Sequence, residues 1–186
     1  LLWLVMGVSA GVLAATRPRT KSDRAVTVTA LFFYSMPSFL LGVIVFYLLF
    51  YRLHLAGIGW FPGNGYVAFT NSPARWAQHL ILPWFTLALV TAAAYARLTR
   101  GSMLDVLGED YIRTARAKGV DEAQVIRRHA LRNALGPLVT LVGLDLGVLM
   151  GGAVVTESIF AWPGLGREVL QAIFEVDIPL IIGVTL

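Results

Sequence analysis

The sequence contains no cysteine, so this chain can build neither a disulfide framework nor a thiolate-bound metal site. Charged residues are scarce: they make up 14% of the 186 residues, against about 25% in an ordinary soluble domain. Hydrophobic residues account for 57% and run in long blocks, while the few charges are clustered. This distribution argues against the one or two soluble domains that the length alone would allow.

Motifs for enzymatic chemistry are missing as well. The chain has no G-x-x-x-x-G-K-[ST] phosphate loop, and the two glycines of WPGLGR are more typical of a turn. The three histidines are scattered without the spacing of metal ligands. No nucleic-acid motif is present. We therefore predict no catalytic residue, no cofactor or metal held by this chain, and no nucleic-acid partner.

What remains is a series of five apolar blocks. Only helices and closed barrels satisfy their backbone in lipid, and these blocks lack the alternation of barrel strands. We predict an all-α, polytopic transmembrane helical bundle that forms one membrane domain, with both ends of the chain incomplete. Pro37 should kink the second span. The expected spans are 1–15 (partial), 26–51, 79–99, 137–156 and 179–186 (partial).

The basic residues predict the orientation of these spans. Residues 17–24 carry four Lys/Arg and residues 97–133 carry eight, which together are twelve of the fifteen in the chain. Two spans separate these segments, so both lie on one side, and the positive-inside rule makes that side the cytoplasm. We expect outward loops at 52–78 and 157–178. Trp60, Phe61, Trp76 and Trp84 would form an interfacial aromatic belt.

A polar segment, DYIRTARAKGV at residues 110–120, interrupts the apolar pattern. Glu109 to Lys118 is acidic at its start and basic at its end, which suits the macrodipole of a short helix. Gly119 suits the left-handed position that ends it. Asp121 can cap a second helix that runs to about residue 135, with Glu122 in its first turn. This helix–glycine–helix is either a solvated basic loop, a helix lying on anionic lipid, or a docking element for a soluble partner.

We expect one apolar face on the second helix, formed by Val120, Ala123, Ile126, Ala130 and Ala134.

The segments YIRTARAKG and HALRNAL, with the later ESIFAWPGLGREVLQAIFEVDIPL, resemble the permease subunits of ABC importers of the dipeptide, oligopeptide and nickel branch. The general signature of such permeases reads Glu-Ala-Ala, three residues, Gly, nine residues, Ile-x-Leu-Pro. Ala115, Gly119 and Leu131 match this pattern, and Arg113 replaces its first Glu. The resemblance extends over essentially all 186 residues.

The resemblance implies that residues 101–135 form a cytoplasmic coupling loop seated in a groove of an ATPase subunit. It implies a second, homologous permease subunit, two cytoplasmic ATPase subunits that bind ATP and Mg²⁺, and an extracytoplasmic substrate-binding protein. The location would be the bacterial plasma membrane, and the function ATP-driven import of di- or oligopeptides. The coupling residues would be Arg113, Thr114, Ala115, Gly119, Asp121, Glu122 and Leu131.

Small and polar residues mark the fourth span. Gly143, Gly147 and Gly151 recur every four residues, a pattern that lets another helix approach closely. We expect this face to pack against a helix, including one of a second permease subunit, or else to line a pathway. An aspartate inside a span is expected to face protein or water. Asp145 is therefore either paired with a basic residue such as Arg132 or exposed in the translocation cavity.

Three other functions stay open. A nickel permease shares the motifs of the peptide branch. A secondary transporter or channel would be expected to show inverted repeats or several charges within its spans, and this chain has one intramembrane carboxylate and no convincing repeat. In a membrane scaffold without transport activity, the polar segment would serve only as a partner site.

Overall fold

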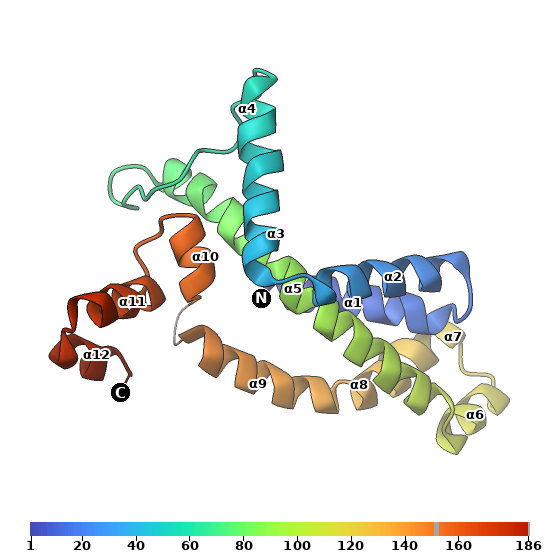
Figure 1. Cartoon of the computed structure of the whole chain (residues 1–186). Helices are drawn as coiled ribbons and strands as arrows, with labels where there is room; N and C mark the ends of the chain where they lie inside the picture. The colour runs from blue at the N-terminus through green and yellow to red at the C-terminus, as the bar shows by residue number, and fades with distance from the viewer. Residues whose placement is uncertain (151–152, 186) are drawn as a thin grey trace. The chain divides into compact units, whose positions relative to one another are not determined.

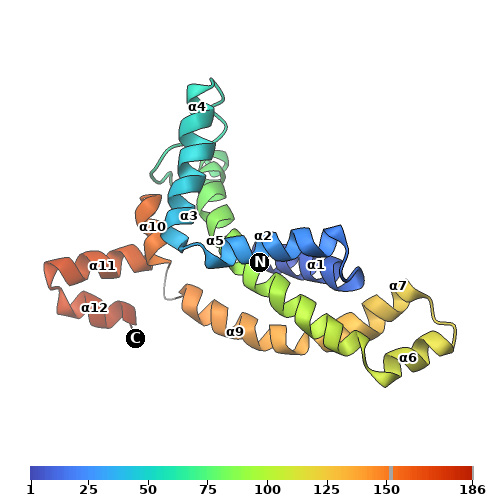
Figure 2. The ribbon, with the colours of Figure 1, turned by 45° about the vertical axis from the view of Figure 1, so that its right-hand side comes forward.

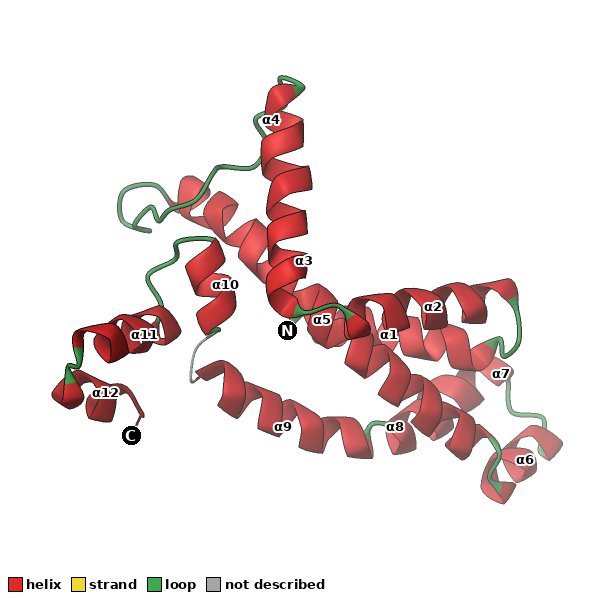
Figure 3. Cartoon of the chain, viewed as in Figure 1, coloured by secondary structure: helices red, strands yellow, loops and turns green. Residues whose placement is uncertain are grey.

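The computed structural model describes residues 1–150 and 153–185. Over these residues the protein consists of helices and connecting loops, without a strand, which confirms the all-α prediction (Figure 3). The chain forms two compact units, one of residues 1–35 and 88–144 and the other of residues 36–87 and 145–186. Two long helices contribute to both units: α5 (Pro73–Leu107) and α9 (Gly136–Met150).

In the first unit, α1 (Leu2–Thr16) and α2 (Lys21–Ser35) lie side by side and pack on the second half of α5 (Figures 1 and 2). Gly7 and Gly11 are the points where the α1 backbone approaches α5. A Cβ on Gly7 would lie 2.6 Å from the Cβ of Tyr95, and one on Gly11 would lie 2.5 Å from the Cβ of Thr99. This close crossing is the small-residue packing of membrane helices.

The rest of the first unit follows α5. It comprises α6 (Asp110–Ala117), α7 (Glu122–Gln124), a π-helical segment (Val125–Ala130), α8 (Leu131–Ala134) and the first part of α9. The helix over Glu122–Ala134 then bends by 50° into α9. The unit therefore joins an apolar helix pair to a short polar helical segment.

The second unit contains α3 (Ser38–Val45), a π-helical segment (Phe46–Arg52), α4 (Leu53–Leu55), an irregular loop at 56–72 and the first part of α5. From the C-terminal part of the chain it adds α10 (Val154–Ile159), α11 (Leu165–Glu175) and α12 (Ile178–Thr185). Edge-to-face aromatic contacts join the N-terminal and C-terminal segments of this unit. The ring centroids of Phe46 and Phe160 are 6.0 Å apart, and those of Tyr66 and Trp162 are 4.9 Å apart.

Two of the described helices are long and apolar enough to cross a membrane, Ser38–Leu55 and Pro73–Leu107, or up to three if the bent pair Glu122–Ala134 and Gly136–Leu149 is one span. The first half of that pair carries Arg127, Arg128 and Arg132, so only its second half suits lipid. The shorter α1 is also apolar. The membrane limits themselves remain predictions.

The helix bounds differ from the predicted spans and loops in four places, and the spans themselves stay predictions. The expected helix over 26–51 is broken, because Pro37 is extended (φ −56°, ψ 135°) and precedes α3 instead of kinking one helix. The helix expected over 79–99 reaches from Pro73 to Leu107. The helix expected over 137–156 ends at Met150, and α10 begins at Val154. The expected outer loop at 157–178 contains α11.

Candidate functional site

The polar segment folds as two helices joined at Gly119, and we call residues 110–134 the elbow. Gly119 has a φ of 79°, the left-handed geometry expected for it. Its N–H donates to the carbonyl of Arg116 at 3.0 Å, and the N–H of Val120 donates to the carbonyl of Ala115 at 3.2 Å. These two hydrogen bonds are the Schellman ending of a helix. The turn is therefore fixed by its own backbone.

The second helix of the elbow begins with the expected cap. The carboxylate of Asp121 accepts a hydrogen bond from the N–H of Ala123 at 3.0 Å. Arg116 reaches across the turn and donates from Nε and Nη2 to the two carboxylate oxygens of Glu122, at 2.9 and 2.7 Å. This bidentate pair lowers the pKa of Glu122. The pair adds an exposed brace across the turn.

A small hydrophobic core holds the elbow against the ends of α1 and α5. Ile112 from α6 and Val125 from the second helix are fully buried, and they pack with Met103 of α5 and Ala15 of α1. Burying an aliphatic side chain of this size stabilises by about 1.5–3 kcal/mol. The elbow is thus a docked element of the first unit.

The seven residues assigned to coupling take different places in the elbow. Arg113 and Thr114 lie on the exposed face of α6, with 72% of the Arg113 side chain accessible. Ala115 and Leu131 are partly buried against the hydrophobic core. Gly119, Asp121 and Glu122 form the turn, the cap and the brace. Arg113 and Thr114 therefore present side chains on the outer face of α6, and Asp121 and Glu122 are exposed at the turn.

Two features of the elbow differ from the sequence analysis. Ala123 was expected on the apolar face but is exposed, whereas Val125 is fully buried. The physical reason is the π-helical segment Val125–Ala130, which turns the helix relative to an ideal α-helical register. The amide of Asn133 also donates to the hydroxyl of Tyr111 at 2.7 Å and ties the second helix back to α6. Sequence spacing alone gave no signal for that contact.

An ion pair that sequence analysis missed lies at the start of α2. Arg100 donates from Nε and Nη2 to the two carboxylate oxygens of Asp23, at 2.6 and 2.9 Å. The backbone N–H of Arg19 donates to the same carboxylate at 2.8 Å. The Arg100 hydrogen bond, more than any other interaction, holds the pKa of Asp23 well below its usual range. The pair fastens α2 to α5 across 77 residues of sequence.

The small residues of α9 lie apart from the elbow core. Gly143 and Gly147 are exposed, and no described atom beyond the helix would lie within 4 Å of a Cβ on either. Asp145 is half-buried in the same helix. Gly151 lies outside the described residues. Within the part of the chain that the structure describes, no group of three or more histidine or acidic residues could hold a metal ion.

Long apolar helices in an all-α fold, together with an ordered polar elbow, define an integral membrane protein. Residues 7–186 match the family described as the binding-protein-dependent transport system inner membrane component, and the chain belongs to that family.

Curated relatives cover nearly the whole chain. A Brucella abortus protein is 45% identical over 181 residues, which is 97% of this chain and 56% of the relative. The oligopeptide transport system permease protein AppB of Bacillus subtilis is 42% identical over 187 residues, which is 100% of this chain and 58% of AppB. The glutathione transport system permease protein GsiC of Escherichia coli K12 is 42% identical over 182 residues, with 97% and 55% covered. The chain thus spans little more than half the length of these relatives.

Proposed function

We propose that the chain forms the core of a membrane-spanning permease subunit in an ATP-driven importer of di- or oligopeptides. Membership of the family supports the transport role. The names of two relatives support peptides as the substrate class, because one is named for oligopeptides and the other for glutathione, which is itself a small peptide.

The elbow is the coupling element in this proposal. The observation that carries it is the combination of a fixed shape with an exposed face. The hydrophobic core, the Asp121 cap and the Arg116–Glu122 pair hold the two helices in place. The outer face of α6 nevertheless leaves Tyr111, Arg113 and Thr114 accessible. A rigid element with an exposed face transmits a push to α1 and α5 better than a mobile loop.

The partners follow from the same proposal. The elbow would seat in a groove of one of two cytoplasmic ATPase subunits, which would bind ATP and Mg²⁺. A substrate-binding protein would deliver peptide from the other side of the plasma membrane. The open glycines of α9, Gly143 and Gly147, would pack against a helix of a second permease subunit. Gly7 and Gly11 support this idea, because the same spacing already brings α1 against α5.

The elbow and residues 17–24 would lie in the cytoplasm, and the 56–72 loop would lie outside. The distribution of Lys and Arg supports this orientation. Cysteines introduced by Ser22→Cys and Asn64→Cys check it with an impermeant thiol reagent added to intact cells. The second position should be labelled and the first shielded. Labelling of Ser22→Cys from outside would overturn the orientation and the coupling proposal with it.

Gly119→Val tests the elbow directly. Valine at a left-handed position costs about 1–2 kcal/mol in the backbone, and nothing around Gly119 adds a steric clash of its own. The second helix should then leave its fixed angle. We expect normal amounts of inserted permease, weaker retention of the ATPase subunits on purification, and a parallel fall in substrate-stimulated ATP hydrolysis and uptake.

Gly57→Val is the matched control. Gly57 has a φ of 78°, almost that of Gly119, and its surroundings are equally open, but it lies in the 56–72 loop. The control should suffer similar local strain and keep its ATPase subunits. If the elbow only lies on lipid, Gly119→Val should also keep them. Full retention and coupled hydrolysis in Gly119→Val would reject the elbow as the coupling element.

A further inference from the structure

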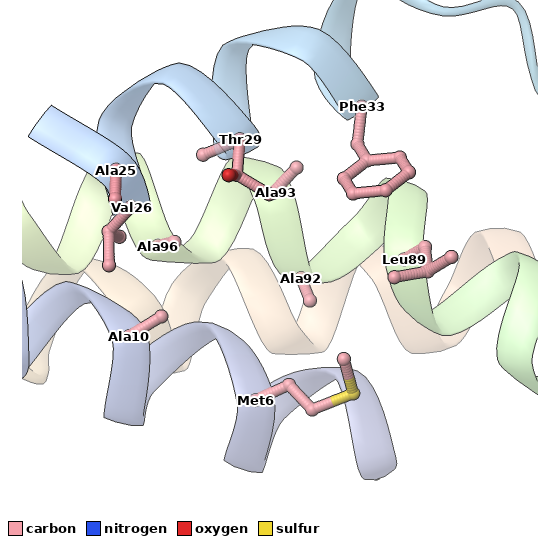
Figure 4. A pocket seen from close by; sticks show the side chains of 11 residues that line it. Met6, Ala10, Ala25, Val26, Thr29, Phe33, Leu89, Ala92, Ala93 and Ala96 are labelled. Atoms are coloured by element: carbon pink, nitrogen blue, oxygen red, sulfur yellow. The ribbon is translucent and has the colours of Figure 1, made fainter.

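An apolar cavity of about 290 Å³ lies between α1, α2 and the second half of α5, entirely within the first unit. Met6 and Ala10 of α1, Phe33 of α2, and Leu89 and Ala93 of α5 point into it (Figure 4). The lining side chains are apolar apart from the hydroxyl of Thr29. Alanines along α5 keep the cavity open where larger residues would fill it.

A second, smaller cavity of about 140 Å³ lies beside the first, and its character is different. The two are neighbours, because Val26, Ala30 and Ala96 line both. The smaller space is also lined by Thr27, Arg97 and Arg100. Along α5, the lining thus changes from leucine and alanine to arginine within three helical turns.

The two arginines differ in how far their charge is compensated. Arg100 is paired with Asp23 through Nε and Nη2, which leaves its Nη1 donors free of that pair. Arg97 is exposed and lies over the ring of Tyr34, 4.9 Å from its centroid. Among the described residues Arg97 forms no ion pair. The basic end of the cavity therefore has a net positive charge available to an anion.

We propose that this composite cavity is a binding site for one anionic phospholipid. An acyl chain would occupy the apolar part between Met6, Phe33 and Leu89. The phosphate would lie between Arg97 and the Nη1 group of Arg100, because the Thr27 hydroxyl already donates to Asp23. Basic pockets between membrane helices recognise anionic headgroups in this way. A helix in the same place would fill the apolar part but would leave Arg97 without a partner. The charge at the end of the cavity therefore favours a lipid.

The site is tested on the full-length permease with its partner subunits. The complex is placed in bilayer discs of phosphatidylglycerol and phosphatidylcholine, extracted into mild detergent, and its retained lipids are counted by native mass spectrometry. Wild type should retain phosphatidylglycerol in preference to phosphatidylcholine. Arg97→Gln should lower that retention about fivefold, the factor equivalent to about 1 kcal/mol for a single cation near an anionic headgroup.

Arg24→Gln is the matched control. Arg24 is exposed near the start of α2, the end of that helix that carries Asp23, and it does not line either cavity. It should retain lipid as wild type does. Equal losses in Arg97→Gln and Arg24→Gln, or equal retention of the two lipids by wild type, would mean a general lipid shell and overturn the proposal.

The apolar part is tested by filling it. Ala93→Phe places a ring in the cavity, and Ala25→Phe does the same from an exposed position that tolerates a larger side chain. Both should lower phosphatidylglycerol retention. Unchanged retention in the folded Ala25→Phe protein would show that no acyl chain occupies the space and would overturn the proposal. The measurement requires no transport, so its outcome is independent of the coupling proposal.

Discussion

Two arginine–carboxylate pairs in the first unit have nearly the same geometry and very different surroundings. Arg100–Asp23 and Arg116–Glu122 are both bidentate, with closest contacts of 2.6 and 2.7 Å. The Asp23 side chain is 6% accessible and Arg100 is 31% accessible, whereas Glu122 and Arg116 are 55% and 41% accessible. The first pair joins α2 to α5, and the second spans a single turn.

The comparison shows that bond geometry does not determine what an ion pair contributes. An exposed pair gains little because water solvates its charges almost as well. A buried pair gives little net gain over apolar packing, but it is costly to break from one side because the remaining charge is stranded. The Asp23–Arg100 pair therefore secures the position of α2, while the Arg116–Glu122 pair adjusts a turn that Gly119 and Asp121 already define.

The largest effect should follow from Arg100→Met, which strands the Asp23 carboxylate while keeping much of the arginine's apolar stem. Arg116→Met is the matched control, the same change in the exposed pair. We expect Arg100→Met to lower the thermal unfolding temperature of the purified permease clearly more than the control does. Equal shifts would show that burial does not distinguish the two pairs.

The same variant should show a defined pH dependence. In wild type the pKa of Asp23 is depressed by Arg100, so the pair stabilises the fold above the unfolded carboxyl's pKa, about 3.9. That contribution is lost only as the pH falls through the lower folded-state pKa. In Arg100→Met, protonation relieves the stranded charge. The gap in unfolding temperature between the two proteins should be widest near neutral pH and narrow below about pH 4.

The smallest effect should come from Glu122→Gln, which removes the charge of the exposed pair and keeps the shape of the side chain. An exposed pair of this kind contributes about 0.2–1 kcal/mol, and less at high salt. We expect a slight loss of stability that disappears in concentrated salt, with the elbow still formed. A large loss that salt does not reduce would show that the brace, and not the Gly119 turn, holds the elbow.

Local sequence signals predicted much of the elbow. Gly119 at its left-handed position and Asp121 as a cap act over one turn of chain, so their residue types are sufficient to place them. The Asp23–Arg100 pair could not be found in this way, because its partners are 77 residues apart. In the sequence each is simply one of several charged residues in a segment rich in Lys and Arg. Only the packing of α2 on α5 brings them together.

For the fold as well, what the sequence predicted rests on local patterns, and what it missed depends on packing. The apolar blocks indicated membrane helices, but hydropathy does not show whether Pro37 bends a helix or ends it. The π-helical segment at Val125–Ala130 exchanged Ala123 for Val125 on the buried face, and no periodicity of 3.6 residues predicts such a shift. The roles of Arg113, Thr114 and Asp145 depend on partners and stay predictions.

Among the described residues, four helix ends close with the same pair of hydrogen bonds. Glycine occupies the left-handed position after α4 (Gly57) and in the elbow (Gly119), but not after α10 or α11. Ala161 after α10 has a φ of 50° and Val176 after α11 a φ of 57°. The N–H of Trp162 donates to Glu157 and the N–H of Asp177 donates to Ala172, at 2.8 and 2.9 Å. A β-branched residue is strained in this conformation, and fraying of the helix end releases the strain. Local opening is therefore easier at the end of α11 than at the end of α6, which makes the α10–α12 segment readier to rearrange while the elbow keeps its shape.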